Sequence, residues 1–313
     1  MENKISQEEL IPVQFGGEDN DCSTYEKAKA VIVPVPYGKT VCYKPGTENG
    51  PRAILDASRN LELFDDELGK DTYRIGIHTA AELEVHNFPP EEMVAQVEKK
   101  VASLIKDSKF PIIVGGEHTV SVGAVRALAK ANKDMSVLYL DAHYDMRDSF
   151  KGLKLSHACV ARRISEICPT TIVGSRSFSK EEKNALPNPN VHVFNVYDIL
   201  DIPNWKEKIK DSVRDSLYIS IDLDVLDPSI MPSVGTPEPG GLGWYEILDL
   251  LHYIIEHKEL VGMDIVELCP IKDMVAPDFM AAKLIYRLLG YNFVGGKKIA
   301  SKKDNNGTKK EGQ

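Results

Sequence analysis

Three short segments of the sequence concentrate the types of side chain that bind metal ions. They are Gly-Gly-Glu-His at 115–118, Asp-Ala-His-Tyr-Asp at 141–145 and Asp-Leu-Asp at 222–224. In an extended backbone, residues two apart point to the same side of the chain. Asp141, His143 and Asp145 can therefore face one point, and Asp222 and Asp224 can do the same.

The predicted ligand set is too large for a single structural zinc ion, which takes four ligands. Its members are His118, Asp141, His143, Asp145, Asp222 and Asp224. Four clustered carboxylates repel one another and are costly to bury unless cations neutralise them. They fit two divalent ions with bridging carboxylates and positions open to water. The oxygen-rich set favours two Mn²⁺ per subunit, and Co²⁺, Ni²⁺ or Fe²⁺ remain compatible with it.

Taken singly, each segment has a more ordinary explanation. A histidine after two glycines is more often a hydrogen-bonded loop residue, and Asp-x-Asp at a strand end more often forms a cap or a turn. All three segments, however, follow predicted strands, and ligands of parallel α/β sheets bind where the strands end. The combination favours a metal centre.

Short apolar runs rich in β-branched residues precede these segments and recur along the chain. Near-continuous apolarity is typical of strands that are buried on both faces of a parallel sheet. We predict strands at 30–35, 73–77, 110–114, 135–140, 170–173, 191–196, 216–221 and 260–266. Apolar residues with helical period predict helices at 94–105, 247–255 and 279–289, the last ending before Gly290.

Strands that alternate with helices predict an α/β fold with a parallel sheet covered on both sides. The interior contains neither an internal repeat nor a Pro/Gly-rich linker, so we expect one domain over residues 1–294. Residues 295–313 are rich in Lys, Asn and Gly and almost free of apolar residues. This composition predicts a disordered polar tail.

The composition excludes several classes of protein. A net charge of −9 over 313 residues argues against nucleic-acid or anionic-membrane partners. The five scattered cysteines form no close pair of the kind found in zinc ribbons or disulfide frameworks. No apolar run approaches the roughly 20 residues that span a bilayer, and MENKISQEEL lacks the apolar core of a signal peptide. We expect a cytoplasmic protein.

Four longer motifs resemble the signature blocks of the ureohydrolase family, which contains arginase and agmatinase. They are GGEHTVS, DAHYDMRD, SIDLDVLDPSIMPSVGTPEPGGL and DIVELCP, and with PGTENGPRAILDAS the resemblance covers about residues 31–289. It implies a three-layer α/β/α arginase-like fold with a central, mostly parallel eight-stranded sheet. It also implies a binuclear manganese site and a homotrimer or homohexamer.

The resemblance assigns the same six ligands that the spacing indicates. Asp141 and Asp222 would bridge the two ions, with His118 on one ion and His143 on the other. Asp145 would accept a hydrogen bond from the metal-bridging hydroxide that attacks the guanidinium carbon, and would then move its proton toward the leaving amine.

Three further residues receive roles from the resemblance. Glu267, in DIVELCP, would pair with the guanidinium nitrogens through two parallel hydrogen bonds. Thr236, in the GTPEPGG loop, would support the substrate. His157 matches a histidine that passes protons to the leaving amine, although Ala158-Cys159 after it departs from the family's pattern.

The same loops suggest a small cationic guanidino substrate. GTPEPGG is the agmatinase-like form of its loop, and Met146-Arg147-Asp148 stands where arginase keeps an asparagine for the carboxylate of arginine. We therefore expect hydrolysis of agmatine to urea and putrescine, with Asp148 pairing with the far amine. Arg147 would repel that amine unless an ion pair neutralises it. Arginine, guanidinobutyrate and aminopropylagmatine remain alternative substrates.

Two other classes of protein compete with this interpretation. A deacetylase on a related scaffold typically holds one zinc ion and lacks the paired Asp-Ala-His-x-Asp and Asp-x-Asp segments. A non-catalytic, metal-binding family member would be expected to lose ligands, whereas all six are present here.

Overall fold

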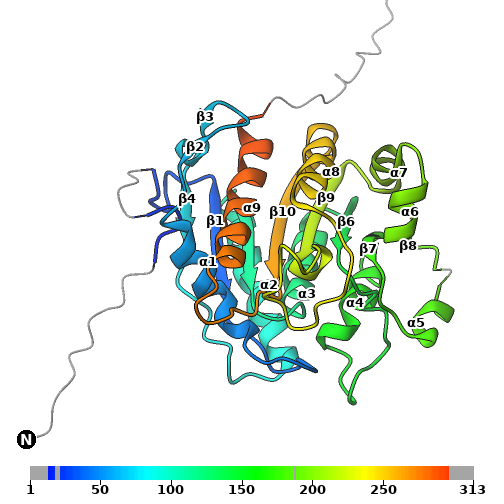
Figure 1. Ribbon diagram of the computed structural model, residues 1–313. Helices are drawn as coiled ribbons and strands as arrows, with labels where there is room; N and C mark the ends of the chain where they lie inside the picture. The colour runs from blue at the N-terminus through cyan, green and yellow to red at the C-terminus, as the bar shows by residue number, and fades with distance from the viewer. Residues whose placement is uncertain (1–12, 18–21, 187, 296–313) are drawn as a thin grey trace, which may run out of the picture.

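An eight-stranded sheet forms the centre of the computed structural model, which describes residues 13–17, 22–186 and 188–295 (Figure 1). The order across the sheet is β4 (Ile77–Thr79), β1 (Ala30–Val35), β5 (Phe110–Gly115), β10 (Glu259–Val266), β9 (Ser216–Asp222), β6 (Met135–Leu140), β7 (Thr170–Ser175) and β8 (Val191–Asn195). Neighbouring strands pair in parallel throughout this sheet. All their carboxyl ends therefore lie along one edge.

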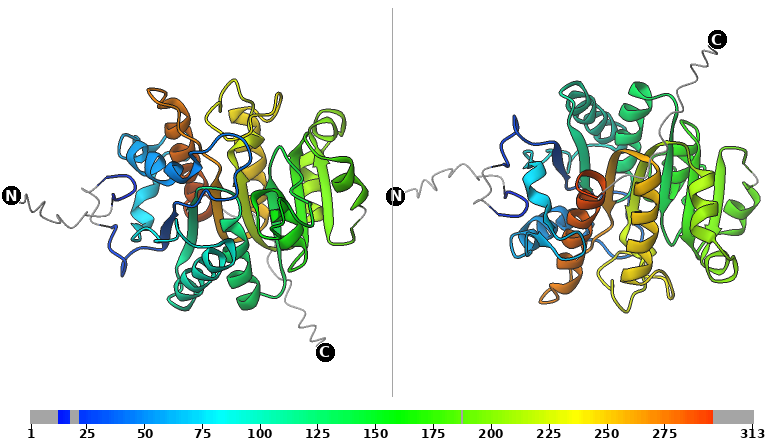
Figure 2. Two further views of the ribbon diagram at one scale, coloured as in Figure 1. Left: turned by 90° about the horizontal axis from the view of Figure 1, so that it is seen from below. Right: turned by 90° about the horizontal axis from the view of Figure 1, so that it is seen from above.

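Helices cover both faces of the sheet and give three layers (Figure 2). One face packs against α2 (Pro90–Lys106), α3 (Val120–Ala131) and α4 (Val160–Ser165). The other packs against α1 (Gly50–Ser58), α7 (Trp205–Ser212), α8 (Trp244–His257) and α9 (Ala276–Phe293). The short helices α5 (Lys180–Asn184) and α6 (Val196–Asp201) flank β8, and β2 (Phe64–Asp65) and β3 (Lys70–Asp71) form a separate antiparallel pair. The three-layer α/β/α fold with a central parallel eight-stranded sheet, expected from the sequence, is confirmed.

The strand β1 shows why the apolar runs are nearly continuous. Ala30 and Ile32 belong to the core beneath α1, α8 and α9, whereas Val31 and Val33 belong to the core beneath α2 and α3. Successive side chains of a strand point to opposite faces, so a sheet covered on both sides needs apolar residues at consecutive positions.

The strand predicted at 73–77 is wrong in its position. The chain forms a 3₁₀ helix at Thr72–Ile75, and β4 begins only at Ile77. Gly76 separates the two with a φ of 79°, and the backbone amide of Tyr73 donates to the hydroxyl of Tyr286 instead of to a neighbouring strand. The apolar residues of this segment are buried against α9, which a pattern of hydrophobicity cannot distinguish from burial in a sheet.

The last predicted helix continues beyond Gly290, where it was expected to end. The helix α9 runs to Phe293. A Cβ at Gly290 would lie 2.7 Å from Cδ1 of Leu68 and 2.9 Å from Oγ1 of Thr72. This glycine therefore permits a close approach between the helix and the segment after β2, and does not terminate the helix.

Two further predictions concern the extent of the domain and the C-terminal tail. The prediction of one domain over residues 1–294 stays a prediction. The predicted polar tail lies outside the described residues except for Gly295. Among the residues that are described, no helix is both long and apolar enough to cross a bilayer.

Candidate metal centre and active site

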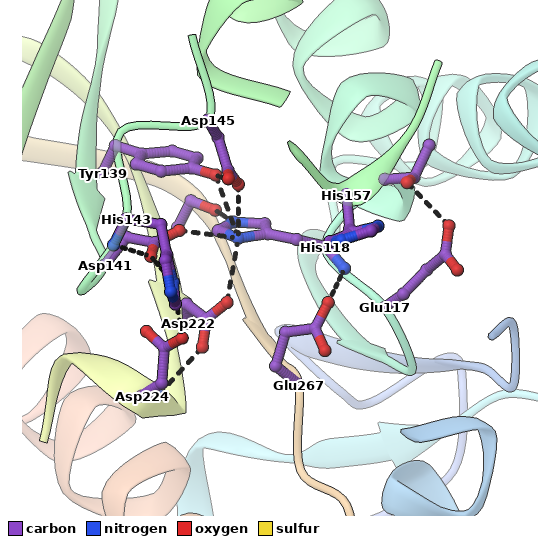
Figure 3. A network of polar contacts seen from close by, with 12 residues as sticks. Glu117, His118, Tyr139, Asp141, His143, Asp145, His157, Asp222, Asp224 and Glu267 are labelled. Carbon is purple, nitrogen blue, oxygen red and sulfur yellow. Dashed lines mark hydrogen bonds and ion pairs between the residues drawn. The ribbon is translucent and has the colours of Figure 1, made fainter. Parts of the chain in front are cut away.

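The six predicted ligands meet at the carboxyl edge of the sheet. His118 lies just after β5, the Asp141 segment follows β6, and Asp222 ends β9. Asp224 lies in the 3₁₀ turn Leu223–Val225. Parallel strands end at one edge, so segments that are far apart in the sequence converge there. Figure 3 shows these side chains pointing toward one another.

The ring of His118 lies at the centre of one group of carboxylates. Its Nδ1 is 3.2 Å from Oδ2 of Asp141, 3.3 Å from Oδ2 of Asp222 and 3.8 Å from Oδ2 of Asp145 (Figure 3). All four side chains are buried. One imidazole nitrogen and three carboxylate oxygens thus face a common point.

The ring of His143 defines a second group beside the first. Its Nδ1 lies 2.9 Å from Oδ2 of Asp224 and 3.4 Å from Oδ1 of Asp141. Asp141 therefore presents one oxygen to each histidine. A carboxylate in this position can bridge two cations.

The donor set fits two divalent cations. Ligand atoms of His118, Asp141 and Asp145 lie within 4.8 Å of one another, and so do those of Asp141, His143 and Asp224. Oδ2 of Asp141 is buried and accepts no well-formed hydrogen bond from any residue that the structure describes, so one of its lone pairs is left for a cation. Oxygen donors with two imidazoles suit manganese, and they also suit other divalent ions of the first transition row.

The titration of the carboxylates also indicates that cations belong here. Burial and the neighbouring Asp141 carboxylate raise the pKa of Asp145 well above its usual range. Burial and the neighbouring carboxylates of Asp224 and Asp141 also raise the pKa of Asp222 well above its usual range. Burial opposes ionisation of Asp141 too, but the His118 and His143 rings outweigh it and lower its pKa. Without cations, protons must compensate this concentration of negative charge.

A layer of polar residues behind the ligands holds them in place. Nε2 of His118 lies 2.8 Å from the hydroxyl of Ser220, which donates to Oδ1 of buried Asp264 at 2.8 Å. The hydroxyl of Tyr139 donates to Oδ2 of Asp145 at 2.6 Å. Partners of this kind orient a ligating imidazole or carboxylate.

Sequence reasoning missed these supporting residues, although the signal was present. Tyr139 precedes Asp141 by two positions, and Ser220 precedes Asp222 by two. The same two-residue period that identified the ligands therefore places both side chains on the ligand side of their strands.

The backbone is unusual at the two acidic residues expected to act on the substrate. Asp145 has a φ of 48° and Glu267 a φ of 67°, in the left-handed region that residues other than glycine rarely adopt. Such conformations persist only where the surrounding structure enforces them, and they concentrate at functional sites.

Glu267 lies in a cavity of about 390 Å³ together with the metal ligands. The residues lining it include His118, His143, Asp145, Asp222 and Thr236. Oε1 of Glu267 accepts a hydrogen bond of 2.7 Å from the backbone amide of His118. Burial and the neighbouring Glu117 raise the pKa of Glu267 to about 8. This half-buried acid is well placed to receive a cation from the cavity.

His157 lines the same cavity from the 3₁₀ helix His157–Cys159. Its ring is edge-on to Phe150, with 5.4 Å between the ring centroids. Burial and the nearby His143 lower the pKa of His157 to about 4. The ring is therefore neutral at physiological pH.

The structure does not bring Asp148 to the cavity. Its side chain is 62% exposed and accepts a hydrogen bond of 3.0 Å from Arg163, so its position does not support the expected contact with the substrate amine. Arg147 does line the cavity, where its guanidinium lies 3.6 Å from Oε2 of Glu182. The ion pair that neutralises Arg147 is thus formed with Glu182.

Arg176 connects the metal centre to the GTPEPGG loop. Its Nη2 donates to the carbonyl oxygens of Asp224 and Glu238, both at 2.8 Å, and its Nε donates to that of Pro239 at 3.0 Å. One guanidinium therefore holds the loop that bears Thr236 against the turn that bears a metal ligand. No sequence pattern predicts these contacts of Arg176, because its partners are backbone carbonyl oxygens.

Comparison with known proteins supports the arrangement. Residues 28–290 match the model of the arginase family. The chain is 40% identical to the N(1)-aminopropylagmatine ureohydrolase of Synechocystis sp., over 90% of this chain and 94% of that protein. It is 32% identical to the agmatinase of Pyrococcus horikoshii, over 84% of this chain and 92% of the relative.

A solved structure agrees with these relatives. The agmatine ureohydrolase of Thermoplasma volcanium superposes with a TM-score of 0.76 at 33% identity. The match covers 88% of this chain and 93% of that protein.

Proposed function

The chain belongs to the arginase family, and on that premise we propose that N(1)-aminopropylagmatine is its preferred substrate. Hydrolysis of the guanidino group would release urea and leave the triamine spermidine. Agmatine, which lacks the aminopropyl arm, would be the second substrate and would leave putrescine. The coarser statement needs no proposal: the chain is a ureohydrolase of the agmatinase and aminopropylagmatine ureohydrolase type, acting on guanidino C–N bonds.

The observation that supports this function most strongly is the position of Glu267. This half-buried carboxylate shares one cavity with His118 and His143, one from each group of proposed ligands, and accepts a hydrogen bond from His118. A planar guanidinium can form two parallel hydrogen bonds with a carboxylate. Bound in this way, its carbon would face the ligand groups.

This preference for N(1)-aminopropylagmatine replaces the prediction from the sequence, which favoured agmatine. Four relatives that match more than four-fifths of the chain are named N(1)-aminopropylagmatine ureohydrolase. The aromatic residues Phe150, Phe178 and Tyr43 line the cavity, and the last two are exposed to solvent. Aromatic faces attract ammonium groups, so a longer polycation would gain contacts with these rings. Arg147 does not oppose it, because Glu182 neutralises its charge.

In the proposed reaction, each residue has a distinct task. The six proposed ligands would hold two divalent cations, which we propose are Mn²⁺, and the cations would make water acidic enough to attack at neutral pH. Glu267 holds the guanidinium and Thr236 limits its movement. Asp145, fixed by Tyr139, orients the attacking oxygen and accepts its proton. The neutral ring of His157 would take up this proton from Asp145 and deliver it to the leaving nitrogen, which keeps the electron pair of the broken C–N bond.

Urea release by the manganese-loaded protein tests this proposal. N(1)-aminopropylagmatine, agmatine, arginine and guanidinobutyrate would be offered in parallel, with chelated protein as the control. We expect the highest kcat/KM for N(1)-aminopropylagmatine and a lower value for agmatine. Absence of urea from all four would favour a non-catalytic, metal-binding family member.

A further inference from the structure

The hydroxyl of Thr40 connects His157 to a buried acid. Oγ1 of Thr40 lies 3.2 Å from Nδ1 of His157 and 2.7 Å from Oε1 of Glu117. We propose that Thr40 is a positioning residue that sets the orientation and the tautomer of His157, with Glu117 as its anchor. This inference rests on the proposed function, because it assigns His157 a proton-transfer task.

The hydrogen-bond directions around Thr40 determine which ring nitrogen is protonated. A threonine hydroxyl has one hydrogen and two lone pairs. Thr40 gives its hydrogen to Glu117, so toward His157 it can only accept. It accepts the backbone N–H of His157 at 3.0 Å, and the ring at Nδ1. A neutral His157 therefore bears its hydrogen on Nδ1 and a lone pair on Nε2.

This tautomer suits a residue that moves a proton inside the cavity. For Nε2 of His157 no hydrogen bond occurs with any residue that the structure describes. Nδ1 lies 3.2 Å from the hydroxyl of Thr40 and 3.4 Å from that of Ser156, so Thr40 is its nearer partner. Nε2 is thus the nitrogen left to take up a proton and to deliver it to the leaving amine. Which ring nitrogen reacts is set by the hydrogen bond that the other one makes.

Thr40 is held firmly enough for this task. Oε2 of Glu117 accepts a hydrogen bond of 2.6 Å from the backbone amide of Thr40. The carboxylate of Glu117 therefore binds Thr40 through two hydrogen bonds. The backbone amide of Glu117 in turn donates to the carbonyl of Tyr37 at 2.7 Å. A Cβ at Gly116 would lie only 2.1 Å from that carbonyl oxygen, so only glycine allows the two segments to approach. Both Thr40 and Glu117 are buried.

Thr119 offers a matched control for Thr40. Its hydroxyl also donates to Oε1 of Glu117 at 2.7 Å, and it is also buried. The ring of His157 contacts Thr40 and not Thr119. Replacing either threonine by valine therefore removes one hydrogen bond from Glu117, but only Thr40→Val removes the nearer acceptor for Nδ1.

The experiment compares Thr40→Val, Thr40→Ser and Thr119→Val with the parent. In the manganese-loaded protein, Thr40→Val should lower kcat about 10- to 100-fold, since proton transfer and correct placement each contribute on that scale or above it. KM should stay within about twofold. Thr40→Ser should restore most of the parent kcat. Thr119→Val should keep the parent kcat, even if its Tm falls as much as that of Thr40→Val.

A second readout reports the tautomer itself. Ring ¹⁵N shifts of His157 would be measured in zinc-loaded protein, because manganese broadens the signals. We expect protonation at Nδ1 in the parent, in Thr40→Ser and in Thr119→Val, and a loss of that preference in Thr40→Val. Protonation at Nε2 in the parent, or an unchanged kcat in Thr40→Val, would overturn the inference. Failure of the proposed function would instead appear as no urea from the parent, with the ring shifts still measurable.

Discussion

The carboxylate of Glu267 accepts a hydrogen bond of 2.7 Å from the backbone amide of His118, 149 positions away in the sequence. The contact is possible because β5 and β10 are neighbours in the sheet and end at the same edge. It attaches the proposed guanidinium partner to a proposed metal ligand. The distance between substrate and metal centre is therefore set by the rigid sheet, as precise positioning requires.

Glu267→Gln should impair the reaction without disturbing the metal centre. The amide oxygen of glutamine can still accept from the backbone of His118, but the negative charge facing the guanidinium is lost. Hydrogen bonds to charged groups contribute roughly 1.5–3 kcal/mol, so kcat/KM should fall about 10- to 100-fold. Urea release gives the rate, and metal analysis should find the parent's metal content. Parent-like kcat/KM would refute the role of Glu267.

Asp145→Asn should leave the fold intact and remove most of the activity. Asparagine tolerates the left-handed backbone found at this position and can still accept the hydrogen bond from Tyr139. It cannot accept the proton of the attacking oxygen, so kcat should fall by about 10²-fold or more. The assay needs saturating metal, because the substitution also weakens a ligand. Urea release at the parent rate would exclude the proposed role.

Removal of the metal ions should destabilise the protein more at high pH than at low pH. In the metal-free protein the pKa values of Asp145 and Asp222 lie above their usual range, so the folded state retains protons that the unfolded state releases above about pH 4. The stability that these groups contribute is therefore lost as pH rises. Cation binding releases those protons and strengthens with pH.

The measurement is the difference in Tm between manganese-loaded and chelated protein, taken at about pH 5.5 and about pH 8. Manganese at roughly 100 times its Kd raises the free energy of unfolding by about 2.7 kcal/mol, which raises Tm by several degrees. We expect the difference to widen at the higher pH. A difference that stays constant or narrows would show that these carboxylates do not bind the ions.

Arg176→Met should destabilise the fold and weaken metal binding together. The substitution leaves the carbonyl oxygens of Asp224 and Glu238 without their donor, at a cost of about 2 kcal/mol in the free energy of unfolding. Denaturant unfolding and manganese titration would measure both effects. Arg74→Met is the matched control, because Arg74 is an exposed partner of Asp71 and should change neither. If stability fell while the affinity for manganese stayed unchanged, the contact of Arg176 with the loop would not support metal binding.

Most of the sheet could be predicted from the sequence because burial on both faces leaves a continuous apolar pattern. Seven of the eight predicted strands coincide with observed strands to within two residues at each end. The exception at 73–77 contains Arg74 and Gly76, and most of it forms a 3₁₀ helix that contacts α9. Patterns of hydrophobicity report that a residue is buried and do not report against which element.

The convergence of the six proposed ligands could also be predicted from a local pattern. A two-residue period at a strand end is local information, and it places Asp141, His143 and Asp145 on one side. The contacts of Thr40 with His157, and of Arg147 with Glu182, join segments whose proximity depends on the whole fold. Nothing in the local sequence indicates them. The manganese, the homotrimer or homohexamer and the cytoplasmic location stay predictions.

The central claim is that this chain hydrolyses the guanidino group of N(1)-aminopropylagmatine at a metal centre. Its most direct test is to quantify urea and spermidine released from that substrate by manganese-loaded protein, beside the same protein after chelation. We predict one urea for each spermidine, a kcat/KM above that for agmatine, and no product after chelation. Absence of urea above the chelated control would contradict the account, and a higher kcat/KM for agmatine would contradict its choice of substrate.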